Sequence, residues 1–504
     1  MKSSSIKAGA AISYVSIVLN IVVSLVYTPW MINTIGKSDY GIYSLVMSFL
    51  SYFLLDFGLG SAISRFIAKY RAAGDKEGIN RMFSVTTLVY LCLDIIIFAT
   101  LAILYFFVSD IFVKLTPSEM ETFRMAYIIA AFFSVSNFFF NPFTGAMMAF
   151  EYFVPLKVLD MAQRLGTVGL ITLALFFGGD IYALVLVNGG MALAVSVCKF
   201  VFVKRNTDIV IKFKSFDKKI AKSLFGFSSW IFLINIAQRL RLNLIPSVLG
   251  VYSGTAEIAL FAVGMNLEGF VFNFSNALNG LFIPKVSRMV QENADDRSDV
   301  SKLMTKVGRI QLYVVGYIII GLFGFGKSFI DLWIGKDYSD TYYIMVFLIA
   351  PNIISMTQAI GTTLSYVENE VRYNSIIAMS VSVLSLVLSV LLAPRYGAIG
   401  CGCAFFISMM LSCLFSNIFY KKILKLNVID FFRNCHLKIC HVHVVILALM
   451  LLYDNYVGIG SWPYLIIAGG IYTIVYALAC YYMCLNVSER AMVHETLNKI
   501  KKII

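Results

Sequence analysis

Charged residues are scarce in this chain, and their scarcity excludes a soluble fold. Asp, Glu, Lys and Arg make up 14% of the 504 residues, against about 25% in an average soluble domain. Hydrophobic residues make up 59%, so most of the chain must lie within a lipid bilayer. The formal net charge of +13 does not indicate a nucleic-acid partner, because the basic residues lie in short loops between apolar runs.

The sequence also lacks the motifs of several enzyme classes. It contains no Gly-rich phosphate-binding loop, zinc-protease motif or nucleophile elbow. No polar segment is long enough for a soluble catalytic domain. We therefore expect a protein that is not an enzyme, binds no cofactor and does not itself use ATP. Work against a gradient must then come from H⁺ or Na⁺ coupling, or from downstream consumption of the product.

The nine cysteines are scattered and form no disulfide framework. One cluster, between Cys435 and His443, holds two cysteines and three of the four histidines. Its two interpretations are a metal site and a loop that leads into a helix. The spacing fits no zinc pattern, so we expect the loop and no metal.

Apolar runs long enough to span a bilayer recur fourteen times. About 20 residues at roughly 1.5 Å each cross the hydrocarbon core. The predicted spans cover residues 8–29, 40–60, 82–108, 124–148, 156–178, 181–203, 223–250, 257–284, 309–330, 341–366, 373–393, 397–420, 439–453 and 463–485. The first run is longer than the apolar region of a signal peptide, which has about 7–15 residues, and is interpreted as an uncleaved span.

The distribution of lysine and arginine sets the orientation, because these residues favour the cytoplasmic side. With both termini cytoplasmic, the loops on that side hold 33 of the 41 basic residues and the other face holds six. The remaining two, Arg239 and Arg241, lie within the seventh span. The sequence thus predicts an all-α polytopic membrane protein of about fourteen transmembrane helices with cytoplasmic termini.

The two halves of the chain resemble each other weakly, which predicts a duplicated six-helix unit. Three similarities recur at offsets of 217 or 218 residues: Phe150-Glu151-Tyr152 with Val367-Glu368-Asn369, Pro29 with Pro246, and Gly179-Asp180-Ile181 with Gly397-Ala398-Ile399. The predicted parts are an N-terminal lobe at 1–203, a basic linker at 204–222, a second lobe at 223–420, and a loop, helices 13 and 14 and a tail at 421–504. Such parallel repeats place substrate between the lobes near the midplane.

The seventh span carries the predicted substrate site. An arginine deep in a bilayer costs about 2.5–3.5 kcal/mol on insertion scales, so it must face a partner or a cavity. At roughly 100° per residue, Asn235, Arg239 and Asn243 share one face, while Arg241 points elsewhere. This face suits an anion.

Three acids are candidates for ion coupling: Glu268 in span 8, Asp94 in span 3 and Asp56 near the end of span 2. Glu268 and Arg239 lie at similar depth in one predicted hairpin, so an ion site and a purely structural ion pair both remain open. Asp94 could carry a proton or hydrogen-bond a neighbouring helix, and Asp56 could belong to a polar helix end. Pro142 and Pro351 occupy similar places in spans 4 and 10, where proline favours a kink. We consider both as hinges.

The segment from Tyr40 to Arg81 resembles bacterial oligosaccharide flippases of the Wzx type. The matching features are Tyr40-Gly41, Asp56-Phe57-Gly58-Leu59, Arg65 to Ala68, and Asp75. The resemblance implies the multidrug/oligosaccharidyl-lipid/polysaccharide exporter fold in the bacterial inner membrane. It implies transfer of a polyprenyl-pyrophosphate-linked oligosaccharide to the outer leaflet, for O-antigen or capsule synthesis by alternating access. Relatives hold the pyrophosphate with cavity arginines, a role that falls here to Arg239.

The resemblance leaves two other functions to compare. A drug or cation antiporter of the same fold would need a cavity dominated by acids, against which Arg239 and Arg241 argue. A membrane glycosyltransferase or polymerase would need a larger outer loop. As partners we expect the lipid-linked oligosaccharide, membrane lipid, and the polymerase and chain-length machinery, with the protein itself a monomer.

Overall fold

The computed structural model describes residues 19, 21–51, 54, 59–211, 232–233, 236–237, 239–241, 243–276, 282–292, 296–491 and 494. Over these residues all regular elements are helices and no strand occurs. Ten of the helices are long and apolar enough to cross a membrane. Large side chains such as Ile95, Ile96 and Phe98 are exposed on them, which suits lipid rather than water. The chain is a multi-pass membrane protein.

The helices pack into two compact units. Unit 1 comprises Met1–Met265 and Val371–Ser408, and unit 2 comprises Asn266–Glu370 and Met409–Ile504. The lobe boundaries expected from the internal repeat are defined by sequence similarity, whereas these two units are defined by packing. The lobe boundaries stay a prediction.

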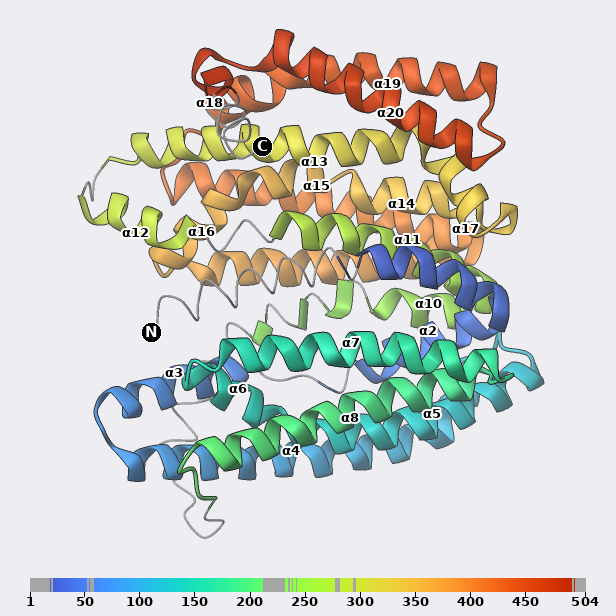
Figure 1. Cartoon of the computed structure of the whole chain (residues 1–504), viewed down its shortest axis with the longest axis vertical. Coiled ribbons are helices and arrows are strands. Elements are labelled where there is room, and N and C mark those ends of the chain that lie inside the picture. The colour runs from blue at the N-terminus through green and yellow to red at the C-terminus, as the bar shows by residue number, and fades with distance from the viewer. Residues whose placement is uncertain are drawn as a thin grey trace, which may run out of the picture. The chain divides into compact units, whose positions relative to one another are not determined.

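Unit 1 is built on four long helices, α4 (Lys76–Ile111), α5 (Pro117–Phe138), α7 (Phe153–Phe176) and α8 (Ile181–Asn206). Helix α5 packs against both α4 and α8, and α8 packs against α7 (Figure 1). The other helical parts of unit 1 are Ile21–Ile35, α2 (Lys37–Ser51), α3 (Leu59–Ala72), α6 (Asn141–Ala149), α10 (Leu244–Tyr252), and the parts of α11 (Thr255–Asn276) and α17 (Val371–Lys422) up to Met265 and Ser408.

Local sequence signals explain where the helices of unit 1 begin. The side chain of Asp75 accepts a hydrogen bond from the backbone N–H of Gly78 at the start of α4. Thr116 and Glu119 form a reciprocal capping box at the start of α5, and Asp180 caps α8. Each of these side chains satisfies backbone N–H groups that a helix start leaves without a partner.

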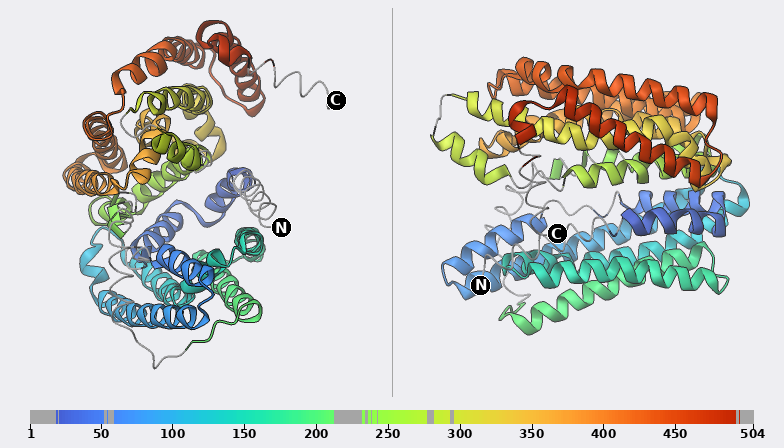
Figure 2. Two further views of the ribbon diagram at one scale, coloured as in Figure 1. Left: turned by 90° about the vertical axis from the view of Figure 1, so that its left-hand side faces the viewer. Right: turned by 45° about the horizontal axis from the view of Figure 1, so that its top comes forward.

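Unit 2 is organised along α13 (Ser298–Trp333), which packs against α19 (Lys438–Val457) and α20 (Trp462–Ala479) (Figure 2). Its other elements are the end of α11, α12 (Ile283–Glu292), η2 (Lys336–Tyr338), α14 (Thr341–Ile349), α15 (Asn352–Ser355), η3 (Met356–Gln358), α16 (Ala359–Val367), the end of α17, α18 (Val428–Phe432), η4 (Arg433–Leu437) and η5 (Cys480–Cys484).

Helix α13 starts eleven residues before the apolar run that predicted it at 309–330. The added turns carry charges of both signs, including a salt bridge between Lys302 and Asp299 at 3.0 Å, so hydropathy alone could not reveal them. The predicted span at 223–250 is described only in part, because residues 223–231 lie outside the described ranges.

Helix α17 is two helices joined at a glycine. Its 52 residues would extend for about 78 Å at 1.5 Å per residue, more than twice the hydrocarbon thickness. At Gly397 the backbone turns to φ +53° and ψ −136°, which a residue with a side chain rarely adopts. The backbone N–H of the next residue, Ala398, donates to a carboxylate oxygen of Glu257 at 2.7 Å. The break lies where two separate spans, 373–393 and 397–420, are predicted.

Left-handed backbone positions recur along the chain at an almost constant interval. Gly254 (φ +98°) follows Gly36 (φ +88°) by 218 positions. Asn369 (φ +60°) follows Glu151 (φ +62°) by the same interval, and Gly397 follows Gly178 by 219. These offsets lie within two residues of the 217 and 218 found in the sequence. Backbone geometry therefore supports a duplicated unit independently of side-chain identity.

Candidate functional site

The predicted substrate residues lie just before α10, in unit 1. The backbone N–H of Asn243 donates to the carbonyl of Arg239 at 2.9 Å, one helical turn earlier. The side-chain amide of Asn243 donates to Ser51 Oγ of α2 at 2.9 Å. Arg241 lies elsewhere on the turn, with its guanidinium carbon 5.9 Å from the centre of the Phe405 ring.

Arg239 itself is half-buried. None of the salt bridges among the described residues involves it. A guanidinium carries five N–H donors and no acceptor, which suits an anion. Two other predicted residues, Asn235 and Asp56, lie outside the described residues, so their roles stay predictions.

Glu268 lies in a buried polar cluster of unit 2. It is 8% exposed, and Asn352 is 4% exposed. The side-chain amide of Asn352 donates to Glu268 Oε1 at 3.1 Å, and Ser355 Oγ donates to Asn352 Oδ1 at 3.4 Å. Arg239 and Glu268 belong to different units, so their pairing stays a prediction.

Pro351 immediately precedes Asn352, at a break in the helix. Helix α14 ends at Ile349, and the chain passes through α15 and η3 before α16 begins at Ala359. The matching break in unit 1 separates α5 from α6, with Pro142 as the second residue of α6. Proline cannot donate a backbone hydrogen bond, and it disturbs the preceding turn. Both hinge candidates therefore lie at broken helices, and the cluster of Glu268 lies against one of them.

Asp94 is buried in α4, with 8% of its surface exposed. Its Oδ1 atom has no hydrogen-bond partner among the described residues. Asp94 lies between two contacts that join α4 to α5. The Tyr90 and Phe138 rings lie 5.2 Å apart, and Tyr127 Oη donates to the carbonyl of Leu101 at 2.8 Å. The carboxyl therefore lies inside unit 1, where an ionised form without a partner would be costly.

Glu119 holds three helix starts together. Its carboxylate accepts hydrogen bonds from Ser38 Oγ of α2 at 2.6 Å and from Thr255 Oγ1 of α11 at 2.5 Å, besides the Thr116 backbone N–H at 2.9 Å. Packing here is close, because a Cβ atom on Gly41 would overlap the carbonyl of Thr255. We call Ser38, Thr116, Glu119 and Thr255 the Glu119 cluster. It joins elements that precede and follow the basic linker.

A second charged cluster ties the C-terminal segment to α13. Arg309 Nε donates to Glu489 Oε1 at 2.6 Å, and its other nitrogens donate to the carbonyls of Asn434 and Cys484, each at 2.7 Å. Burial alone would raise the pKa of the Glu489 carboxyl, but hydrogen bonds from Arg309, from the Asn486 backbone and from Tyr313 hold it below its ordinary value.

The cysteine and histidine cluster shows no metal geometry. No group of three or more potential ligands comes together among the described residues. His443 Nε2 lies 2.9 Å from Tyr476 Oη, whereas His436 Nε2 lies 3.4 Å from the carbonyl of Ile353. Instead of a loop, the π-helix η4 connects α18 directly to α19, so this part of the expectation was wrong. Cys435 of η4 is buried, and η4 packs against α13, which favours helix over loop.

Sequence reasoning missed the Glu119 cluster and the pair of Arg309 with Glu489. The first had a readable signal, because Thr116-Pro117-Ser118-Glu119 is a capping box with proline at the helix start. The pair of Arg309 with Glu489 had no local sequence signal, since 180 residues separate the two partners.

The comparisons with known proteins agree with this architecture. A family described as "Polysaccharide biosynthesis protein" matches residues 6–290. The uncharacterized membrane protein EpsK of Bacillus subtilis (strain 168) is 19% identical over 489 residues, covering 96% of each chain. The capsular polysaccharide biosynthesis protein CapF of Staphylococcus aureus is 24% identical over 152 residues, which is 30% of this chain and 37% of CapF.

Solved structures share the fold. The lipid II flippase MurJ in an inward closed conformation matches with a TM-score of 0.67 at 15% identity, covering 94% of this chain and 98% of MurJ. An inward-facing multidrug resistance transporter of the MATE family, within the MOP superfamily, matches with a TM-score of 0.65 at 14% identity, covering 83% and 99%. The resemblance inferred from Tyr40–Arg81 is confirmed. One family model matches more than half the length of this multi-pass membrane protein. The chain belongs to the polysaccharide biosynthesis protein family.

Proposed function

We propose that the protein is a flippase for polyprenyl-pyrophosphate-linked oligosaccharide repeat units. It moves them from the cytoplasmic to the outer leaflet of the bacterial inner membrane, where they are used for surface polysaccharide. The observation that carries the proposal is membership of the polysaccharide biosynthesis family over residues 6–290. The fold shared with MurJ supports it. In this proposal the protein moves its substrate without changing it chemically, so it is not an enzyme.

The proposal includes fourteen transmembrane helices with both termini in the cytoplasm. Ten described helices are candidate spans, and α17 has the length of two. The predicted first span lies mostly outside the described residues, and the seventh does so in part.

Arg239 would bind the pyrophosphate. A guanidinium presents paired donors that match phosphate oxygens, and that of Arg239 is half-buried. Asn243 would assist from the next turn, where its contact with Ser51 fixes it. Arg241 would hold position through the Phe405 ring, and Asn235 would line the same face as Arg239.

Glu268 would couple transport to H⁺ or Na⁺. Its hydrogen bond to Asn352 connects an ionisable group to the broken helix at Pro351. A change in protonation or ion occupancy would alter that bond and so bias the hinge. Asp94, buried with an oxygen that lacks a partner among the described residues, is the corresponding candidate in unit 1, with Pro142 as its hinge.

Transport by inverted inner-membrane vesicles tests the proposal. Labelled lipid-linked oligosaccharide is placed in the outer, originally cytoplasmic, leaflet, and its protection from added glycosidase is followed. Hydrogen bonds to charged groups contribute about 1.5–3 kcal/mol, so Arg239→Ala should slow protection roughly 10- to 100-fold. Arg239→Lys should recover only part, because lysine lacks the fork. Arg395→Ala, which removes an exposed arginine, is the matched control.

Each outcome of that assay has a meaning. Protection no faster than in vesicles without the protein would refute the flippase. Equal rates in wild type and Arg239→Ala would keep the flippase and remove Arg239 from its mechanism. Glu268→Gln should abolish the response to an imposed proton or sodium gradient, and an unchanged response would remove Glu268 from coupling.

A drug or cation antiporter remains the second candidate, favoured by the match to the MATE transporter. That match, at 14% identity, concerns the fold. An antiporter should extrude cationic dyes from cells and leave their surface polysaccharide unchanged when its gene is deleted.

A further inference from the structure

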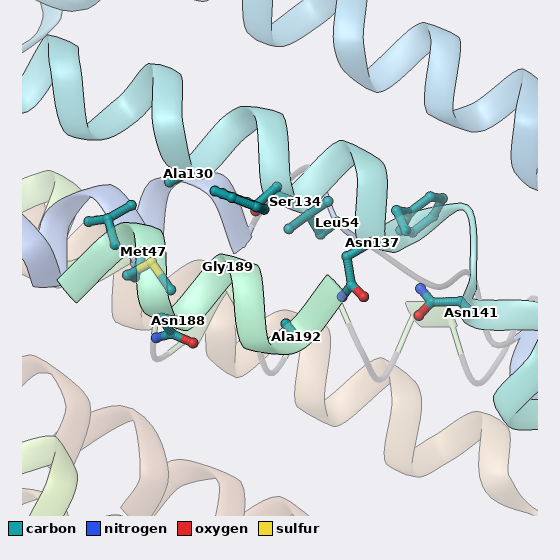
Figure 3. A pocket seen from close by; sticks show the side chains of 12 residues that line it. Met47, Leu54, Ala130, Ser134, Asn137, Asn141, Asn188, Gly189 and Ala192 are labelled. Carbon is teal, nitrogen blue, oxygen red and sulfur yellow. The ribbon is translucent and has the colours of Figure 1, made fainter. Parts of the chain in front are cut away.

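Unit 1 contains a polar pocket apart from the residues discussed so far. Its volume is about 300 Å³. Helices α5 and α8 form most of its wall, and α2 contributes Met47 (Figure 3). Four polar side chains line it, all half-buried: Ser134, Asn137, Asn141 and Asn188. Polar side chains within membrane-spanning helices are costly unless they serve a partner or a ligand.

Two of the asparagines are fixed by one hydrogen bond each. Asn188 Nδ2 donates to Tyr43 Oη at 2.7 Å, which leaves its carbonyl oxygen as an acceptor. Asn137 Oδ1 accepts from Ser196 Oγ at 2.5 Å, which leaves its amide N–H groups as donors. The pocket therefore presents a fixed acceptor and a fixed donor.

The other two polar side chains have no tether among the described residues. No side-chain hydrogen bond to Ser134 or Asn141 occurs within the described part of the chain. In Figure 3 the side chain of Asn141 lies beside that of Asn137, at the end of the pocket where α5 gives way to α6. These groups can adjust to a ligand, whereas the tethered pair sets its orientation.

The lining also excludes two ligand classes. Among the described residues it contains no charged side chain, so none of them offers a counter-charge to the pyrophosphate or to an organic cation. The remainder of the wall is apolar and includes the aromatic rings of Phe133 and Phe138. Neutral donors and acceptors beside aromatic rings suit a pyranose, whose hydroxyls both donate and accept and whose C–H face packs on a ring.

We infer that this pocket binds one sugar ring of the lipid-linked oligosaccharide. The inference rests on the flippase proposal and extends it by assigning the sugar and the pyrophosphate to different residues. A volume of about 300 Å³ lies at the lower end of ligand sites, which span roughly 300–1,000 Å³. It suits a single ring better than a whole repeat unit or a polyprenyl tail.

Helix α2 connects the sugar pocket to the arginine segment. Met47 lines the pocket, and Ser51, one turn later on the same face, accepts the hydrogen bond from Asn243. The two binding regions thus share one face of one helix. A pyrophosphate at Arg239 and the sugar attached to it would therefore contact neighbouring turns of α2.

Photo-crosslinking in living cells tests the inference. The photoreactive residue p-benzoylphenylalanine replaces Phe133, which lines the pocket, or its neighbour Phe132, which is 64% exposed and does not line the pocket. Cells that make their surface polysaccharide receive a tritiated monosaccharide precursor and are irradiated. Label attached to the purified protein is counted. We expect at least tenfold more label at position 133 than at 132.

Filling the pocket is the second part of the test. Ala192→Leu adds volume inside the pocket, whereas Ala194→Leu makes the same change at an exposed position of the same helix. Ala192→Leu, and separately Asn188→Leu, should reduce the label at position 133 about tenfold, and Ala194→Leu should leave it unchanged. Restoration of polysaccharide in a deletion strain is measured in parallel.

The two proposals fail differently in this experiment. If the protein restores polysaccharide but position 133 gains no more label than 132, or Ala192→Leu leaves the label intact, the pocket does not bind the sugar and the flippase stands. If deletion of the gene leaves surface polysaccharide unchanged and neither position is labelled, both proposals are overturned.

Discussion

Glu489 accepts hydrogen bonds from Arg309, from Tyr313 and from the Asn486 backbone. Its side chain is 5% exposed, and that of Arg309 is 6% exposed. Removing one partner of a buried pair typically costs about 3–5 kcal/mol, because the remaining charge stays buried. We therefore expect Glu489→Gln to lower the thermal unfolding temperature of the detergent-purified protein. A double replacement, Arg309→Met with Glu489→Leu, should restore part of the loss.

The same residue gives a prediction for pH. The folded protein holds the pKa of Glu489 below its ordinary value of 4.5. Its contribution to stability is therefore complete above pH 4.5 and decreases as the pH falls through the lower folded-state pKa. The difference in unfolding temperature between wild type and Glu489→Gln should be constant from pH 7 to 5 and shrink below pH 4. A difference that grew on acidification would contradict the assignment.

At the scale of elements, the Glu119 cluster joins helices on both sides of the basic linker. Ser38 Oγ lies 3.3 Å from Thr255 Oγ1. If alternating access moves the two predicted lobes apart, this contact must open in each cycle. We expect Ser38→Cys with Thr255→Cys to form a disulfide on mild oxidation, to block transport, and to regain transport after reduction.

The matched control for that pair is Ser38→Cys with Ala256→Cys, because Ala256 is exposed and adjacent to Thr255. It should leave transport unchanged after oxidation. Full transport by the oxidised Ser38 and Thr255 pair would mean that the cluster is static.

Helix ends illustrate what sequence could and could not predict. The break at Gly397 was predictable, because two apolar runs of spanning length meet there. Its capping was not. Where the first half has Asp180, which caps its own helix, the equivalent Ala398 has no carboxylate, and Glu257 supplies one from α11. A contact across 141 residues leaves no periodic trace in sequence, whereas local caps and hydropathy do.

The residues of the candidate site also differ in whether the sequence could predict them. Arg239, Glu268 and Asp94 stand out in sequence because a charge is rare in an apolar run. The neutral pocket residues do not, since an asparagine in a helix is ambiguous until its neighbours are known. Asn137 and Asn188 became informative only when their single tethers were seen.

At the scale of the whole molecule, the recurring left-handed residues support a duplicated architecture. Gly36 with Gly254 and Glu151 with Asn369 keep one interval although most residues around them differ. Backbone turns at helix ends restrict sequence less than side-chain contacts do. Such turns can therefore persist after similarity between two halves has largely disappeared.

Topology can be tested with reporter fusions. Alkaline phosphatase is active only outside the cytoplasm. Green fluorescent protein fluoresces only inside the cytoplasm, because it does not become fluorescent when it is exported unfolded. With cytoplasmic termini, a fusion after Arg490 should fluoresce, and a phosphatase inserted at Gly458, between α19 and α20, should be active. The opposite pattern at both sites would invert the proposed orientation, and equal signals would remove α20 as a span.

The bond between Arg309 and Glu489 also has a consequence for biosynthesis. A ribosome adds about 5–20 residues per second, so the 180 residues between the two partners take roughly 9–36 s. Throughout that time Arg309 is already made, while its guanidinium lacks the carboxylate. Nascent chains must pass through a stage in which water, lipid phosphate or the insertion machinery shields this charge. A chain truncated before Glu489 would remain in that stage.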